Sequence, residues 1–121
     1  MNRYGEMWDQ QEAFMKLLCQ KRGFPPYPVN LESKEGQKFI KNLTYECMGE
    51  LFEANQELKN SKSHRVTENQ HFNREAYVEE LVDCLHYFFE IAICSGVNQD
   101  ELFEAYIKKG EKNFQRIENG Y

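Results

Sequence analysis

Four glutamates recur at helical spacing in the middle of the chain. Glu46, Glu50, Glu53 and Glu57 are separated by four, three and four positions. At about 100° per residue, a helix places all four within a stripe of roughly 60°. Stacked like charges destabilise an isolated helix by roughly 0.2–0.5 kcal/mol per pair. Either solvent or a bound cation must therefore favour this arrangement.

The acidic stripe borders an apolar stripe on the same predicted helix. The apolar stripe consists of Leu43, Cys47, Leu51, Ala54 and Leu58. A face that is merely solvated lies opposite the buried seam of a helix, whereas these carboxylates lie beside it. The pattern favours acidic side chains at the edge of a helix interface.

A second acidic pair, Glu80 and Asp83, occurs downstream, one helical turn apart. Glu80 falls within an apolar arc of its helix, formed by Ala76, Cys84, Tyr87 and Ile91. A lone ionised carboxylate in such a place is costly unless it is paired or binds a metal. Two such helices packed face to face gather four oxygen donors, which suits Mg²⁺. A wholly solvated acidic face, the alternative interpretation, does not explain the position of Glu80.

Helix signals predict the elements that must carry these residues. The expected helices cover residues 4–22, 33–60, 73–94 and 98 onward, with Gly23, Ser33, Asn73 and Asn98 at their ends. A proline-rich loop over residues 24–29 follows the first helix, and further loops cover residues 59–65 and 67–72. The sequence predicts an all-α fold, a bundle of about four helices in one domain that spans residues 1–121.

Composition narrows the classes of function. The 121 residues carry a formal net charge of −5, which argues against a nucleic-acid partner. No stretch of 18 apolar residues and no signal-peptide core occurs, so we expect a cytoplasmic protein without a membrane partner. The four cysteines form no Cys-x-x-Cys pair, so we expect reduced core residues.

Several polar residues are candidates for binding a ligand. Gln11 lies within an apolar stripe with Met7, Phe14 and Leu18, where its amide either bonds to backbone or reads a base. Lys62 belongs to a basic loop that is either solvated or in contact with phosphate. Three residues near the end, Lys109, Asn113 and Arg116, share one helical stripe, which is either an exposed face or a contact to triphosphate and sugar. We interpret His86, on the polar arc with Glu79 and Glu90, as a surface histidine.

Three motifs resemble those of a known superfamily. The first is Glu50-x-x-Glu53, followed after 26 residues by Glu80-x-x-Asp83. The second motif has two parts: Leu-Val-Asp83-Cys-Leu-His86-Tyr-Phe and, further along the chain, Lys109-x-x-x-Asn113-Phe-x-Arg116-x-x-x-Gly120-Tyr121. The third motif, near the start of the chain, is Met7-x-Asp9-x-Gln11. Together they resemble the all-α nucleoside triphosphate pyrophosphatases, a superfamily that includes MazG proteins. The similarity is greatest to the branch of dimeric dUTPases and phage dCTPase-dUTPases, and covers most of the chain.

The resemblance implies a reaction and roles for residues. In that superfamily Mg²⁺ is held by two acidic pairs, and water attacks the α-phosphorus of a nucleoside triphosphate. Carried over, the metal ligands and catalytic residues are Glu50, Glu53, Glu80 and Asp83, with Glu46 as an extra acid. One of Glu50 and Glu53 is alternatively the general base. The alternative to Mg²⁺ at this metal site is Mn²⁺. Phosphate and sugar contacts fall to Lys62, Lys109, Asn113 and Arg116, and the base contact to Gln11.

The resulting hypothesis is hydrolysis of dUTP, or else dCTP, to the monophosphate and pyrophosphate. A MazG-like enzyme acting on a purine nucleotide such as dGTP is one alternative, and a non-catalytic helical nucleotide-binding protein is another. The broad apolar surface over residues 82–92 exceeds what one protomer of this length buries. We therefore expect a bundle of the MazG and dimeric dUTPase type, completed as a homodimer or dimer of dimers.

Overall fold

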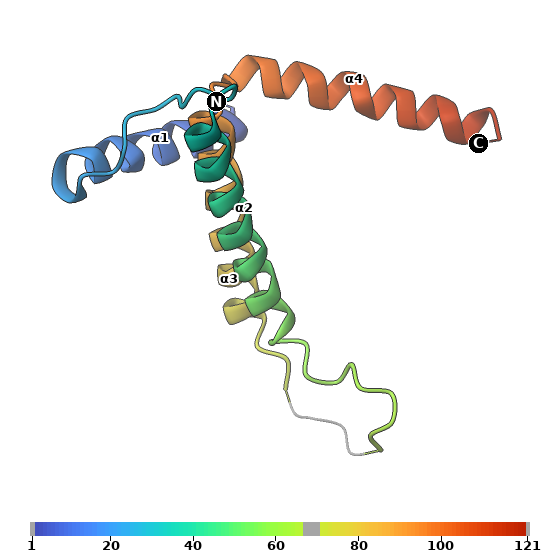
Figure 1. Ribbon diagram of the computed structural model, residues 1–121. Helices are drawn as coiled ribbons and strands as arrows, with labels where there is room; N and C mark the ends of the chain where they lie inside the picture. Colours follow the sequence, from blue (N-terminus) through green and yellow to red (C-terminus); the bar gives the residue numbers. More distant parts are fainter. Residues whose placement is uncertain (1, 67–70, 121) are drawn as a thin grey trace.

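The computed structural model describes residues 2–66 and 71–120. These residues form four helices and no strand, namely α1 (Arg3–Arg22), α2 (Lys34–Asn55), α3 (Arg74–Cys94) and α4 (Gln99–Glu118). The prediction of an all-α fold is confirmed. Helices α2 and α3 lie side by side as an antiparallel pair, α1 crosses one end of that pair, and α4 runs away from it (Figure 1). Among the described residues, no helix is long and apolar enough to cross a membrane.

Local capping sets where the helices begin. The side chains of Asn2, Ser33, Asn73 and Asn98 each accept a hydrogen bond from the backbone N–H three residues later. These bonds satisfy donors that the first turn of a helix leaves free. At the other end of α1, Gly23 adopts a left-handed conformation with φ of 68°, which glycine tolerates without steric cost. The predicted starts at Ser33, Asn73 and Asn98 are therefore confirmed.

The predicted end of the second helix, near Asn60, is wrong. Helix α2 ends at Asn55, five residues earlier. The N–H groups of Glu57 and Leu58 bond to carbonyls only three residues back, those of Ala54 and Asn55. Ala54 is also the last buried residue of the helix. Beyond it, no buried contact holds the chain helical, so it turns into the loop. Of the predicted loop over residues 67–72, positions 67–70 lie outside the described residues.

An aromatic cluster joins α1 to the far end of α3. The ring of Trp8 lies 5.5 Å from that of Phe89 and 6.0 Å from that of Tyr4, measured between centroids. The buried core comprises Trp8, Met15, Leu43, Phe89, Ala92, Ile93 and Cys94. This packing turns Trp8, Gln11 and Met15 inward. The predicted apolar face of α1 is therefore wrong, because Met7 and Phe14 are exposed.

Backbone contacts hold the proline-rich loop against α3. The N–H of Val29 donates to the carbonyl of Cys94 over 2.8 Å. Downstream of it, Gly36 packs so closely that an added Cβ would overlap the carbonyl oxygen of Asn30. The rings of Phe24 and Phe39 meet edge to face at 5.9 Å. The loop is thereby fixed beside α2.

Large apolar side chains remain exposed on several helices of one chain, α3 and α4 among them. On α4, Leu102 packs against the core and the ring of Phe103 lies 6.2 Å from that of Tyr4. The exposed apolar residues of this helix are Phe103, Tyr106, Ile107, Phe114 and Ile117. On α3, the exposed residues are Leu81, Val82, Leu85 and Phe88. Among the described residues of the same chain, the packing contacts of the predicted face of the last helix come from Leu102 and Phe103, near its start. The helices of one chain thus do not enclose a four-helix core.

Candidate functional site

The two predicted acidic pairs meet between α2 and α3. Carboxylate oxygens of Glu50, Glu80 and Asp83 all lie within 4.8 Å of one another. Glu53 lies close enough to Glu50 and Glu80 to raise the pKa of both carboxyls. Since α2 supplies one pair and α3 the other, the side-by-side packing of these helices creates the cluster.

The cluster is electrostatically strained. Burial is the main cause of the raised pKa of the Glu80 carboxyl, followed by the neighbouring Glu53 and Asp83. Burial also raises the pKa of Glu50, and Glu53, Asp83 and Glu80 raise it further. One oxygen of Glu80, Oε2, is buried and has no hydrogen-bond partner in the described part of the chain. Such a group gains by taking up either a proton or a cation.

Two thiols pack beside the acids. The Sγ atoms of Cys47 and Cys84 lie 3.6 Å apart, across the α2–α3 interface. Burial, with Cys84 as its neighbour, raises the pKa of the Cys47 thiol to about 11. A protonated thiol is a poor metal ligand, so the carboxylates remain the ligand set. Both cysteines are free, as predicted, and so are Cys19 and Cys94.

A cavity of about 640 Å³ begins at this cluster and extends along α3. Its lining comes from three helices and the loop after α1, namely Gln11, Phe14, Leu18, Phe24, Pro25, Phe39, Asn42, Leu43, Glu46, Glu50, Asp83, His86, Tyr87 and Glu90. Gln11 is only 4% exposed, because it shares the buried face of α1 with Trp8 and Met15. The cavity therefore runs from carboxylates at one end to aromatic rings and buried polar groups at the other.

Glu46 lies in the cavity and outside the group of close carboxylates. The Tyr87 hydroxyl is hydrogen-bonded to it. Burial and this carboxylate together raise the pKa of Tyr87 to about 12. The tyrosine thus stays protonated and donates across the α2–α3 interface. This arrangement assigns Glu46 a partner other than the cation site.

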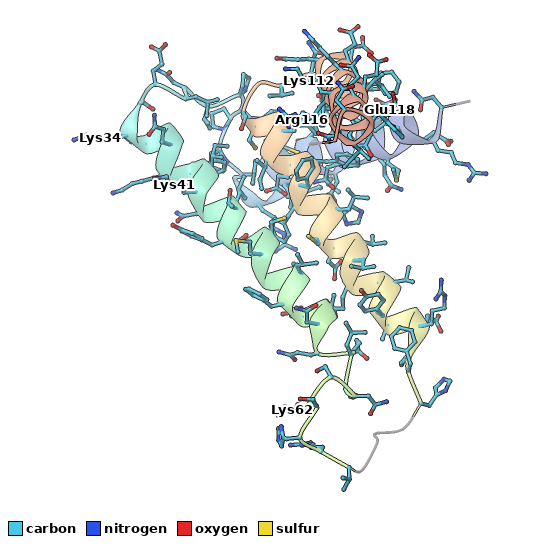
Figure 2. The ribbon with its side chains drawn as sticks, turned by 90° about the vertical axis from the view of Figure 1, so that its right-hand side faces the viewer. Lys34, Lys41, Lys62, Lys112, Arg116 and Glu118 are labelled. Carbon is cyan, nitrogen blue, oxygen red and sulfur yellow. The ribbon has the colours of Figure 1, made fainter. Side chains whose placement is uncertain are left out.

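The predicted phosphate contacts do not gather at the cluster within one chain. Lys62 lies in the loop at one end of the α2–α3 pair, whereas Arg116 lies on α4 near the opposite end (Figure 2). Lys109 and Asn113 belong to the same outlying helix, α4. Among the described residues that line the cavity, there is no lysine or arginine. One chain therefore brings the acids and Gln11 together and leaves the basic residues apart.

Sequence reasoning missed part of the cavity wall. Glu90 was expected on a polar surface, but it is only 8% exposed. Phe39 and Asn42 also line the cavity and were not singled out. The sequence does contain a signal for the burial of Glu90. Asp83, Tyr87 and Glu90 follow one another at spacings of four and three residues, which places them on one face of a helix.

These features define a class, a helical protein with an acidic site at the mouth of a ligand-sized cavity. The family model described as dUTPase matches residues 5–121. The chain therefore belongs to the dUTPase family, within the all-α nucleoside triphosphate pyrophosphatases that its motifs resemble.

A curated relative agrees with this placement. The dCTP pyrophosphatase of Enterobacteria phage T4 is 40% identical over 42 residues. The matched stretch covers 35% of this chain and 25% of the phage protein. No solved structure matches. Family membership thus rests on the match along residues 5–121, and the phage enzyme adds a local similarity.

Proposed function

We propose that this protein hydrolyses a deoxynucleoside triphosphate to the monophosphate and pyrophosphate. The observation that carries the proposal is the convergence of Glu50, Glu80 and Asp83 within 4.8 Å at the mouth of a cavity. A carboxylate cluster without a nearby cation destabilises a fold, so its presence favours a ligand that supplies positive charge. Membership in the dUTPase family supports the same reaction.

A divalent cation fits the residues present, and Mg²⁺ is our first choice, with Mn²⁺ second. Glu50, Glu80 and Asp83 would hold it, since all three offer oxygen donors and Oε2 of Glu80 has no other partner in the described part of the chain. No histidine or cysteine belongs to this group, which disfavours zinc. When bound, the cation supplies charge neutralisation for the phosphates and activation of water.

Glu53 is the group we assign to the attacking water. Unlike the other three acids it is exposed, and it lies next to Glu50 and Glu80, whose pKa values it raises. An exposed carboxylate at the edge of the cluster can orient a water molecule and accept its proton. Glu50, Glu80 and Asp83 then remain as the ligands.

The phosphates require positive side chains that the cavity of one chain does not supply. We propose that a homodimer, or a dimer of dimers, brings them to the site. The uncovered apolar residues on α3 and α4 support assembly, because monomers rarely expose such continuous apolar faces. In this arrangement Lys109, Asn113 and Arg116 on α4 of one protomer approach the acidic cluster of another.

The aromatic end of the cavity is where we place the base, with Gln11 as a reader of its edge. The candidate substrates are the pyrimidine deoxynucleotides dUTP and dCTP. A purine nucleotide such as dGTP is the alternative substrate. A non-catalytic nucleotide-binding protein remains the competing hypothesis from another class.

The test is pyrophosphate release from each deoxynucleoside and ribonucleoside triphosphate, with and without magnesium. We expect magnesium-dependent turnover of a pyrimidine deoxynucleotide, lost in Asp83→Asn and retained in Glu79→Gln. The control changes an exposed acid of the same helix that lies outside the carboxylate group. Absence of turnover with every nucleotide, in protein shown to be folded, would overturn the proposal in favour of the binding protein.

A further inference from the structure

Glu90 is a buried carboxyl that neither the acidic cluster nor the core requires. It is 8% exposed and lines the cavity, at the end where Gln11 from α1 also lies. Its helix neighbours Phe89, Ala92, Ile93 and Cys94 form the apolar core. An apolar residue at this position would pack at lower cost, because burying a carboxyl without a cation is unfavourable.

No lysine or arginine is among the described residues that line the cavity around Glu90. Among the described residues, no hydrogen bond and no positive charge contributes to the shift in the pKa of its carboxyl. Burial is the main cause of its raised pKa, and the nearby Glu46 carboxylate raises it further. Of the other titratable groups nearby, Tyr87 and Cys94 are both held protonated by their own raised pKa values. His86 lies one helical turn before Glu90 and lines the same cavity. The Glu90 carboxyl is therefore available to form hydrogen bonds with a ligand in the cavity.

Its place along α3 matches the length of a nucleotide. Asp83 lies seven residues before Glu90, which corresponds to about 10 Å along the helix axis. Tyr87 lies between them on the same face of the helix. A nucleotide whose α-phosphate is next to Asp83 thus extends past Tyr87 and presents the edge of its base to Glu90 and Gln11. The two buried polar side chains approach that edge from different helices.

We infer that Glu90 is a specificity-determining residue, which accepts a hydrogen bond from the exocyclic amino group of cytosine and so selects dCTP over dUTP. This inference rests on the proposed function for the substrate class, and it reverses the order of the two pyrimidines given above.

The hydrogen-bonding pattern of the two bases decides between them. Cytosine presents an amino donor next to a ring-nitrogen acceptor, whereas uracil presents a carbonyl acceptor next to a ring N–H donor. In the inferred arrangement, the Glu90 carboxyl lies opposite the 4-position of the ring. There an ionised carboxylate, which only accepts, bonds to the cytosine amino group and repels the uracil carbonyl. A protonated carboxyl pairs with either base. Cytosine therefore fits both protonation states of Glu90, and uracil fits only one. The Gln11 amide, which both donates and accepts, is compatible with either base.

The test compares binding of the two monophosphates, dCMP and dUMP, by isothermal titration calorimetry. Binding of a monophosphate needs no turnover, so it separates base selection from catalysis. We expect the wild-type protein to bind dCMP about tenfold or more tightly than dUMP. Glu90→Gln should bring the two dissociation constants close together, because an amide donates to the uracil carbonyl as readily as it accepts from cytosine. The control Glu79→Gln, on the exposed face of the same helix, should keep the wild-type ratio.

Several outcomes would overturn the inference. They are equal or tighter binding of dUMP by the wild-type protein, tighter binding of a purine monophosphate, and an unchanged ratio in Glu90→Gln. A dCMP preference that disappears in Glu90→Gln would support it even if no triphosphate were hydrolysed. That last pattern would contradict the proposed catalytic function alone, so the two failures are distinguishable. Should Glu90→Gln unfold, Glu90→Asp serves instead, with a reduced dCMP preference expected because the carboxyl is withdrawn from the base.

Discussion

Magnesium should raise the unfolding temperature of this protein, and Glu80→Gln should remove most of that increase. Glu80 supplies one of three carboxylate oxygens within 4.8 Å, and its Oε2 has no other partner among the described residues. A ligand that binds only the folded state stabilises it by about 2.7 kcal/mol at one hundred times its dissociation constant. For a chain of 121 residues, this amounts to an increase on the order of 10 °C.

The size of the loss in Glu80→Gln follows from mass action. Losing even an outer partner of a metal ligand weakens metal affinity by about 10–100-fold, and a ligand itself should matter at least as much. At the same magnesium concentration the stabilisation then falls to between about 1.4 and 0.4 kcal/mol. The increase in unfolding temperature should accordingly be half that of the wild-type protein or less.

Thermal unfolding of EDTA-treated protein, followed during a magnesium titration, measures this effect. Glu79→Gln is the matched control, since it removes an exposed carboxylate from the adjacent position of α3. The control should respond to magnesium as the wild-type protein does. An equal response in Glu80→Gln would refute the placement of the cation between α2 and α3.

Three other properties can be tested on the same protein. Because the folded state raises the pKa of Glu50 and Glu80 above 4.5, it holds protons that the unfolded chain releases. The free energy of unfolding of metal-free protein should therefore decrease as pH rises from that value towards neutrality, less so in Glu80→Gln, and urea unfolding at acidic and neutral pH checks this. Phe114→Glu should convert the assembled protein to a monomer with its helix content unchanged, because Phe114 is exposed on α4 in a single chain; sedimentation velocity with circular dichroism would show otherwise. Gly36→Ala should lower the free energy of unfolding by about 1–3 kcal/mol, since the new methyl group overlaps the Asn30 carbonyl, and an unchanged urea midpoint would contradict this.

Much of the fold was predictable because local signals set it. Ser33, Asn73 and Asn98 cap their helices through side-chain hydrogen bonds within one turn, so the sequence nearby contains the necessary information. The end of α2 depends instead on where contact with α3 stops, which no local residue marks. The buried face of α1 depends on where it crosses α3. The pattern of apolar residues alone favoured Met7 and Phe14 over Trp8 and Met15.

The site shows the same division. Glu80 within an apolar arc was enough to predict that two acidic pairs converge, because a buried carboxylate requires a compensating group. Glu90 was not predicted to be buried, since its burial comes from α1 and the loop after it and not from its own helix. The sequence also did not predict how far the basic stripe of α4 lies from the acidic cluster. That distance depends on the direction in which α4 leaves the α2–α3 pair (Figure 1).

Hydrolysis of the preferred triphosphate in water enriched in heavy oxygen, with mass spectrometry of both products, would identify the phosphorus that is attacked. The acidic cluster acting at the α-phosphorus predicts that the label enters the nucleoside monophosphate, that the pyrophosphate stays unlabelled, and that Asp83→Asn abolishes both products. Label in orthophosphate or pyrophosphate, or full turnover by Asp83→Asn, would contradict the assignment of this reaction to the carboxylates of α2 and α3.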